Sequence, residues 1–338
     1  MSGPRLGREL DPFQSYVDAI DSYLTRLFPP NASPLLSLAN SVLEGGKRVR
    51  PLLALLACES VCGDHRPAIP IAAAYELAHS AALIQDDIMD VSPTRRGLGS
   101  VWAQHGARRA MLIVDALLFT IPQVIADYVD GGLPSNKVSR LLRLIGSSAG
   151  ATAWGEHMDL ELTRKGVVGV DDYLEMAKHK TGALLAASSA SGALVGNGSE
   201  VEINRFYEIG ETLGTAYQVT NDIVDIVGDP QASGKQVFND IRNGKKNIVL
   251  VYALESLAES KNKEELELLN RALSDSDLPD QTLMQVKQVL VQTNSVRKAE
   301  QLAKALSEKA TSKLAALTEN PAKPRLALLS EVVLRTHS

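Results

Sequence analysis

The stretch AAAYELAHSAALIQDDIMD, residues 72–90, is an apolar run that ends in three aspartates. At 100° per residue, a helix would place Asp86, Asp87 and Asp90 within one arc of about 100°. Three carboxylates so close together repel each other unless a cation joins them, and burying them without a partner is costly. Oxygen-only ligands suit Mg²⁺. The stretch therefore predicts a helix with a magnesium site at its carboxyl end.

A second cluster repeats this spacing. Asn221, Asp222 and Asp225 lie in the apolar run AYQVTNDIVDI, residues 216–226, with asparagine in the first place. A single such group on a helix is usually a solvated acidic face. Two groups, each embedded in apolar sequence, favour instead two metal-binding helices that face each other.

Nearly all of the remaining chain has helical periodicity. Val17, Ile20 and Leu24 repeat at three and four residues, Ser33-Pro34 indicates a helix start, and Gly45-Gly46 indicates a helix end. No linker rich in proline, glycine or serine divides the 338 residues. We therefore expect an all-α fold with a single domain over residues 1–338. Its motifs lie in residues 45–246, and residues 247–338 are expected to be scaffold helices.

The composition excludes several classes of protein. With 35 Lys+Arg against 40 Asp+Glu, the net charge of -5 gives no reason to expect nucleic acid as a partner. Apolar residues make up 45 %, which excludes intrinsic disorder. Two cysteines cannot form a disulfide scaffold, and the first twenty residues lack a secretion signal. The most apolar stretch, residues 111–126, is too short to span a bilayer, so we expect a cytoplasmic protein without a transmembrane segment.

Basic residues accompany the acidic clusters along the chain. The segment GGKRVRP, residues 45–51, predicts a helix start with Lys47 and Arg50 on one face, which would bind an oxyanion well. Further basic residues follow an acidic cluster or begin a helix: Arg95, Arg96, Lys180, Lys235 and Lys245. Together these side chains indicate more bound anion than one diphosphate carries.

In their order and spacing, the motifs resemble those of the polyprenyl synthetase family, the trans-isoprenyl diphosphate synthases. The matching stretches are GGKRVRP, ELAHSAALIQDDIMD, RRG, KHKTGALL, AYQVTNDIVDI and GKQVFNDIRNGKK. The resemblance implies a helical bundle of the isoprenoid synthase type around a central cavity, and a homodimer. It also implies a prenyltransferase that condenses an allylic diphosphate with isopentenyl diphosphate, with Mg²⁺ as cofactor and three ions in the substrate complex.

The resemblance further implies a role for each motif residue. The metal ligands would be Asp86, Asp87, Asp90, Asn221, Asp222 and Asp225. The residues that bind isopentenyl diphosphate would be Lys47, Arg50, His79 and Arg96. The residues that bind the allylic diphosphate would be Arg95, Lys180, Thr181, Gln218, Lys235 and Lys245, and those with a catalytic role Lys180, Thr181 and Gln218. Asn221 stands where the family has aspartate, and its amide oxygen is a ligand without charge.

Product length depends on the helix before Asp86. In the family, bulky aromatic residues four and five positions before this aspartate stop growth at fifteen carbons. Here these residues are Ala82 and Ala81, Ala78 is also small, and the first large residue on that face is Tyr75, roughly 9 Å below Ala81 at the helical rise. We therefore predict a product of twenty carbons or more, with geranylgeranyl diphosphate as the best candidate and twenty-five to thirty-five carbons as an alternative. A side chain from a neighbouring helix, such as Phe119 or Ile121, would close the tunnel earlier.

Two alternative functions use the same fold. A class I terpene cyclase also ionises an allylic diphosphate, but it needs no site for isopentenyl diphosphate, and Lys47, Arg50 and His79 indicate one. A non-catalytic subunit of a two-component prenyl synthase typically lacks the aspartates that this chain retains.

Overall fold

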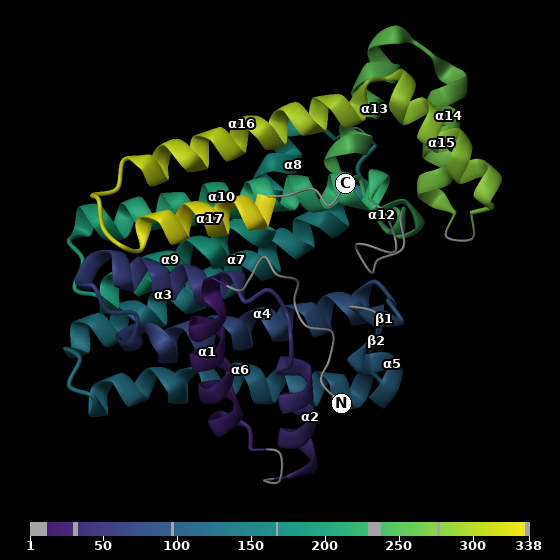
Figure 1. Ribbon diagram of the computed structural model, residues 1–338. Helices are drawn as coiled ribbons and strands as arrows, with labels where there is room; N and C mark the ends of the chain where they lie inside the picture. The colour runs from purple at the N-terminus through teal and green to yellow at the C-terminus, as the bar shows by residue number, and fades with distance from the viewer. Residues whose placement is uncertain are drawn as a thin grey trace. The chain divides into compact units, whose positions relative to one another are not determined.

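The computed structural model describes residues 12–29, 33–95, 98–166, 168–228, 238–275 and 278–334. Within these ranges, nearly every residue outside the connections is helical (Figure 1). The one sheet there is a hairpin in which β1 (Thr94–Arg95) pairs antiparallel with β2 (Leu98–Gly99). The predicted all-α class is confirmed. The sequence does not predict the hairpin, because strands of two residues leave no alternation to detect.

Two compact units share the chain. Unit 1 comprises Met1–Gly150, Ala183–Glu211 and Thr311–Val333, and unit 2 comprises Ala151–Gly182, Thr212–Ala310 and Leu334–Ser338. Four helices contribute residues to both units: α7 (Ser135–Arg164), α10 (Glu200–Val227), α16 (Ser295–Ala315) and α17 (Lys323–Leu334), the last of them by Leu334 alone. That the units form one domain stays a prediction, and so does the scaffold role of residues 247–338.

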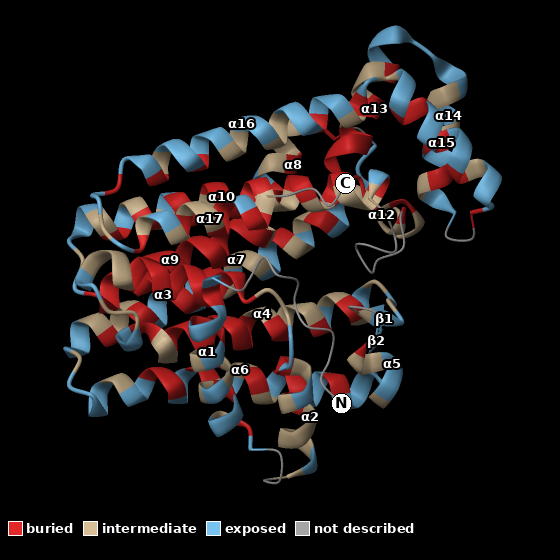
Figure 2. Ribbon diagram, in the orientation of Figure 1, coloured by how far each residue is buried: buried red, intermediate tan, exposed pale blue. Residues whose placement is uncertain are grey.

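Unit 1 contains the helix that ends in the first acidic motif. This motif helix is α4 (Ile69–Met89). The other helices of unit 1 are α1 (Gln14–Leu27), α2 (Pro34–Leu43), α3 (Val49–Cys62), η2 (Arg66–Ala68), α5 (Val101–His105), α6 (Ala107–Asp130), α9 (Ala183–Val195) and α17 (Lys323–Leu334). Helix α4 packs on α1, α3, α6 and α9, and buried residues gather on α3, α4 and α9 (Figure 2). A Cβ on Gly192 of α9 would lie 2.0 Å from the carbonyl oxygen of Ala54 in α3. Only glycine therefore allows these two helices to pack so closely.

Unit 2 contains the helix with the second acidic motif, α10, and the following further elements: α8 (Val170–Ala177), the π-helical turn η3 (Lys178–Gly182), α12 (Asn239–Arg242), α13 (Ile248–Ser260), α14 (Lys263–Ser274) and α15 (Asp280–Gln292). Asn247 and Asn262 cap α13 and α14, because their side chains accept hydrogen bonds from Leu250 N and Glu265 N. The fully buried Tyr173 and the first turn of α13 belong to the apolar core of this unit.

In the first part of the chain, the predicted helix signals agree with the structure at α2 but not at α3. The Ser33 side chain accepts a hydrogen bond from Leu36 N at 3.2 Å, and Gly45 and Gly46 follow α2 with φ of 75° and 93°, so both predicted signals are confirmed. The prediction that Lys47 shares a helix face with Arg50 is wrong, because α3 begins only at Val49. Arg48 has a left-handed φ of 50°, which a helix cannot contain.

Two helical stretches are long and apolar enough to cross a membrane by length and composition. One is Arg66–Met89, with 67 % of its apolar window buried, and the other is Ala107–Asp130, with 39 % buried. A buried core helix passes the same test, and the burial of α4 accounts for the first stretch.

Candidate active site

The first acidic cluster, Asp86, Asp87 and Asp90, closes α4. Asp90 is the C-cap, and its backbone N–H donates to Asp86 O at 2.8 Å. Asp87 is 3 % exposed, and burial raises its pKa even though a nearby arginine acts in the opposite direction. The three carboxylates therefore lie at the end of one helix, as predicted.

That nearby cation is Arg95 of β1. Its Nε donates to Asp87 Oδ1 at 2.9 Å and its Nη2 to Asp86 Oδ2 at 3.1 Å, with a further contact from Nη2 to Asp87. The guanidinium of Arg95 thus partly neutralises the negative charge of the first acidic cluster. The role of Arg95 toward an allylic diphosphate stays a prediction. A ligand that binds Arg95 would have to release the guanidinium from the aspartates.

The donor set of the first cluster fits a divalent cation of the magnesium class, because it consists of carboxylate oxygens that already attract a cation. Among the described residues, no three His, Cys, Asp or Glu side chains converge closely enough to hold a metal ion by themselves. An ion bound here would therefore complete its shell with other oxygens, such as those of a diphosphate.

Predicted ligands of a second anion lie in unit 1 on the loop between α2 and α3 and on α4. Lys47 and His79 are half-buried, and Arg50 is 8 % exposed. Ser188 of α9 donates its hydroxyl to Arg50 O at 2.7 Å, which fixes the backbone of the first turn of α3. Arg96 lies outside the described residues. The assignment of these side chains to isopentenyl diphosphate stays a prediction.

The predicted chain-length residues lie on α4. Ala81 and Ala78 are buried, and Tyr75 is fully buried with its hydroxyl 2.9 Å from Ser191 Oγ of α9. Burial raises the pKa of Tyr75, so the ring is a neutral, fixed group. Of the two residues on α6 that could close the tunnel earlier, Phe119 is 72 % exposed and so does not reach the interior of unit 1, whereas Ile121 is buried and stays a candidate.

The second acidic cluster, in unit 2, consists of Asp222 and Asp225 of α10 with Asp240 of α12. Asp222 is 4 % exposed and accepts hydrogen bonds from three donors: Tyr173 OH at 2.5 Å, Ile248 N at 3.1 Å and Gln218 Nε2 at 2.9 Å. Asp225 accepts hydrogen bonds from the backbone N–H of Asn239 at 3.1 Å and of Asp240 at 3.2 Å. The half-buried Asn221 precedes Asp222. These contacts hold both carboxylates in place on the helix.

Burial changes the protonation of this cluster. The pKa of Asp222 is raised to about 7 and that of Asp225 to about 8, first by burial and then by the charge of Asp240. The pKa of Asp240 is also raised by burial, against the effect of Lys245. Three carboxylates that resist ionisation together are suited to a cation, which would stabilise their charged forms.

Lysines lie beside this cluster in unit 2. Lys180 Nζ is 2.7 Å from both Glu156 Oε2 and Asp159 Oδ2, and Lys245 Nζ is 3.9 Å from Asp159 Oδ2. Thr181 donates its hydroxyl to Gln218 Oε1 at 2.6 Å. The structure therefore brings together five of the predicted residues of α10, η3 and the segment before α13: Lys180, Thr181, Gln218, Asp222 and Lys245. Lys235 lies outside the described residues.

The π-helical turn η3 positions Lys180 and Thr181. The sequence predicts that a helix starts at Lys180, whereas α8, η3 and α9 run on without a break. A Cβ on Gly155 of α7 would lie 2.2 Å from Lys180 N, and one on Gly214 of α10 would lie 2.7 Å from Gly182 Cα. These glycines let two helices reach the backbone of η3, and single π turns are frequent at functional sites.

Sequence reasoning missed three residues in or beside the second acidic cluster. Asp240, Asp159 and Tyr173 contact the predicted residues but were given no role by the motif pattern. A signal existed for the first of them, because Asp240 lies inside the quoted stretch GKQVFNDIRNGKK. That the first and second acidic clusters face each other stays a prediction.

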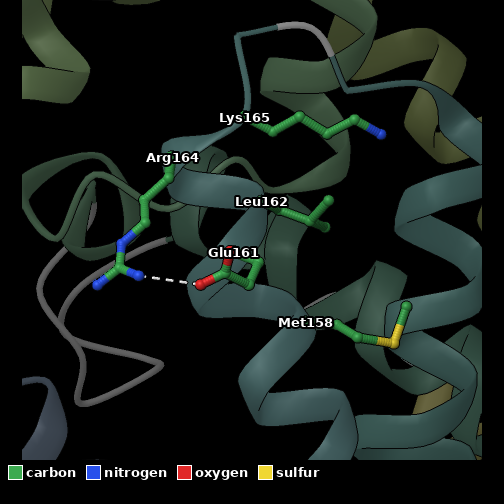
Figure 3. A pocket seen from close by; sticks show the side chains of 5 residues that line it. All are labelled: Met158, Glu161, Leu162, Arg164 and Lys165. Atoms are coloured by element: carbon green, nitrogen blue, oxygen red, sulfur yellow. Dashed lines mark hydrogen bonds and ion pairs between the residues drawn. The ribbon is translucent and has the colours of Figure 1, made fainter.

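A surface hollow of about 440 Å³ lies elsewhere in unit 2, at the carboxyl end of α7 (Figure 3). Its lining is Met158, Glu161, Leu162, Arg164 and Lys165, with an ion pair between Arg164 and Glu161 at 3.0 Å. None of the predicted site residues lines it, so it is not a candidate for the active site.

Residues 33–290 match the Polyprenyl synthetase family. The chain belongs to this family. Geranylfarnesyl diphosphate synthase of Aeropyrum pernix is 36 % identical to this family member over 240 residues, which is 70 % of this chain and 74 % of that protein. A short chain isoprenyl diphosphate synthase of Methanothermobacter thermautotrophicus is 31 % identical over 293 residues, 87 % of either protein. The crystal structure of geranylgeranyl pyrophosphate synthetase from Pyrococcus horikoshii Ot3 has a TM-score of 0.86 at 31 % identity and covers 96 % of this chain and 98 % of that one.

Membership of the polyprenyl synthetase family makes the chain an enzyme, a prenyltransferase of isoprenoid biosynthesis. The predicted function, a trans-prenyltransferase with products in the twenty-carbon range, is confirmed, and neither the terpene cyclase nor the non-catalytic subunit is favoured. The family depends on Mg²⁺. The two relatives and the solved structure are named for different products or product classes. Membership of the family alone therefore does not fix the exact length of the product.

Proposed function

We propose that this prenyltransferase joins an allylic diphosphate to isopentenyl diphosphate and releases geranylgeranyl diphosphate as its main product. The observation that supports this length is the face of α4, where the buried Ala78 and Ala81 lie between the first acidic cluster and the buried ring of Tyr75. Small side chains leave room for a growing hydrocarbon chain, and the fixed ring of Tyr75 would stop its growth. Products of twenty-five to thirty-five carbons are the alternative for the same face.

Residues of unit 2 would bind and orient the allylic diphosphate. Lys180 and Lys245 supply positive charge for the leaving group, together with Lys235. The Thr181 hydroxyl donates to Gln218 Oε1 while Gln218 Nε2 donates to Asp222. This chain of hydrogen bonds fixes the amide orientation, so that the Gln218 carbonyl dipole lies in a set direction beside the developing carbocation.

Side-chain oxygens at the end of α4 and in α10 would hold the magnesium ions. Asp86, Asp87 and Asp90 form one group and Asp222, Asp225 and Asn221 the other, and we propose three ions in the substrate complex. When bound, Mg²⁺ stabilises the charge of the departing diphosphate. Arg95 now neutralises Asp86 and Asp87, and in the substrate complex its guanidinium would turn to the allylic diphosphate. Asn221 contributes an uncharged oxygen, so the second group would hold its ion less strongly than one with three aspartates.

Residues of unit 1 would hold the second substrate. Lys47, Arg50, His79 and Arg96 would bind the diphosphate of isopentenyl diphosphate and keep its double bond close to the allylic C1 atom. The C1–O bond breaks, the double bond attacks C1 to form the new C–C bond, and a proton leaves the resulting cation. The released diphosphate would accept that proton, because it is an anion left close to the cation. The mechanism needs no histidine or cysteine nucleophile.

The chain is further proposed to act as a cytoplasmic homodimer. Support for the dimer comes from α6, where Met111, Leu112 and Phe119 are 62 %, 54 % and 72 % exposed. Leu112 and Phe119 are two turns apart and so lie on one side of the helix. Exposed apolar patches of this kind usually mark an interaction surface. Support for the compartment comes from Cys58 and Cys62, which are both free thiols.

Product analysis tests this proposal. The purified protein is incubated with Mg²⁺, labelled isopentenyl diphosphate and dimethylallyl, geranyl or farnesyl diphosphate, and the dephosphorylated products are separated by chromatography. We expect twenty-carbon alcohol as the main product and none after chelation of the metal. A purely fifteen-carbon product would refute the proposed length. Cyclic hydrocarbon from geranylgeranyl diphosphate alone would point to a cyclase.

A further inference from the structure

Arg48 is the one residue of the GGKRVRP segment's basic trio that received no role. It lies between Lys47 and Arg50, it is 4 % exposed, and its backbone is left-handed with φ of 50°. A buried arginine in a rarely populated backbone conformation needs strong compensating contacts.

Those contacts come from three helices of unit 1. Arg48 Nη1 is 2.6 Å from Glu76 Oε1 of α4, and Arg48 Nε donates to Asp21 Oδ1 of α1 at 3.0 Å. Its Nη2 donates to the carbonyl oxygen of Leu43, the last residue of α2. The side chain of Glu76 is 3 % exposed and that of Asp21 is 46 % exposed. The guanidinium thus joins a fully buried carboxylate, a half-exposed carboxylate and a helix end.

This arrangement connects the two elements that hold the proposed isopentenyl diphosphate ligands. Lys47 and Arg50 lie on the loop and first turn of α3, whereas His79 lies on α4, three residues after Glu76. Residues three apart on a helix are neighbours on its surface. The ion pair between Arg48 and Glu76 is therefore a direct link between the loop and the part of α4 that carries His79.

We propose that Arg48 is a positioning residue for isopentenyl diphosphate, with Glu76 as its buried anchor and Asp21 as its outer partner. The side chain fixes the loop of residues 44–50 against α4, so that Lys47, Arg50 and His79 converge on one diphosphate. This role rests on the proposed function of those three residues. Arg48 itself binds no substrate, because its donors are directed to Glu76, Asp21 and Leu43.

Steady-state kinetics of Arg48→Met tests the proposal, with Arg66→Met as the matched control. Arg66 also pairs with an aspartate, Asp64 at 2.8 Å, but its side chain is 76 % exposed. We expect Arg48→Met to raise the KM for isopentenyl diphosphate about tenfold or more, because a small displacement of binding groups is costly. The KM for the allylic substrate should stay within about twofold, since none of the residues proposed to bind its diphosphate lies in the loop of residues 44–50, and Arg66→Met should change neither value.

A double variant separates positioning from stability. In Arg48→Met, Glu76 is buried without its cation, so the melting temperature of this variant should fall. The double variant with Arg48→Met and Glu76→Gln should recover part of that loss. The KM for isopentenyl diphosphate should remain raised in the double variant, because neither neutral side chain rebuilds the link. Recovery of both properties, a parallel rise of both KM values, or an unchanged KM in a folded Arg48→Met protein would overturn the proposal.

Amide hydrogen exchange distinguishes a failure of this proposal from a failure of the proposed function. Exchange in residues 44–50 should be faster in Arg48→Met than in the unaltered protein or Arg66→Met. Faster exchange with no effect on isopentenyl diphosphate would mean that Arg48 holds the loop but that the loop has another ligand. Unchanged exchange would mean that Arg48 does not hold the loop, whatever reaction the enzyme performs.

Discussion

Asp222 accepts hydrogen bonds from Tyr173, Gln218 and Ile248 N, and each of these lowers its pKa. Burial and the neighbouring charge of Asp240 nevertheless raise the pKa to about 7, and the same two causes raise that of Asp225 to about 8. The folded protein without metal therefore holds protons near neutral pH that the unfolded chain has released. This difference has a measurable effect on stability.

We expect the free energy of unfolding of the metal-free protein to fall as the pH rises from about 4 to about 8. The unfolded chain loses the protons of Asp222 and Asp225 near the usual value of 3.8, whereas the folded protein keeps them until about 7 and about 8. Stability from these groups is complete below the unfolded pKa and is lost as the pH passes the folded values. The decline should be at least about 1 kcal/mol between pH 5 and pH 8, measured by urea unfolding in a chelating buffer.

Two variants control for the general effect of charge. Asp225→Asn should flatten the dependence on pH, because an amide does not titrate. Asp171→Asn removes an aspartate from an exposed position in α8 and should leave the dependence as it is. A free energy of unfolding that stays level or increases over this range would contradict the expected sign.

Single residues also show how far the sequence predicts the site. The motifs indicate Thr181 and Gln218 separately, and the fold joins them by a hydrogen bond of 2.6 Å. The ion pairs of Asp159 with Lys180 and Lys245 could not be predicted, because they depend on segments that meet only in the folded unit. An aspartate in a polar stretch has no local pattern that distinguishes a surface residue from a buried one.

At the scale of helices, α4 sets the expected product length. Ala81→Phe places a large ring about 9 Å above Tyr75, where hydrocarbon is proposed to pass, so the main product should shorten to fifteen carbons. Tyr75→Ala removes the buried ring that ends this face and should extend the product by one or more isoprene units. Chromatography of the labelled products gives both results.

Tyr75→Phe is the matched control, because it keeps the ring and removes only the hydroxyl that lies 2.9 Å from Ser191 Oγ. Its products should have the same length as those of the unaltered enzyme. If Ala81→Phe is folded and active but still makes the original product, the tunnel does not follow this face of α4. Loss of a buried tyrosine side chain costs about 3–5 kcal/mol, so the melting temperature of Tyr75→Ala is measured beside its products.

Helix-scale prediction from sequence succeeds where a signal is local and fails where the backbone departs from the regular helix. The cap at Ser33 and the end at Gly45 depend on neighbouring residues, and both were predicted. The predicted start of α3 is too early, because the left-handed backbone of Arg48 is stabilised by Glu76 of another helix. The π turn at Lys178–Gly182 was not predicted either, since apolar periodicity does not show one extra residue in a turn.

At the scale of the whole molecule, the exposed apolar side of α6 predicts a homodimer. Phe119 is 72 % exposed, and hydrating so large an apolar group in a monomer is unfavourable. Phe119→Glu would place a charge in that contact, which should raise the dimer dissociation constant about tenfold or more. Sedimentation velocity over a range of protein concentrations measures the shift toward monomer. Met284→Glu on α15 is the control, because Met284 is 70 % exposed but lies on another helix, and it should leave the association unchanged. If Phe119→Glu sediments like the unaltered protein at every concentration, the contact between copies does not use this side of α6.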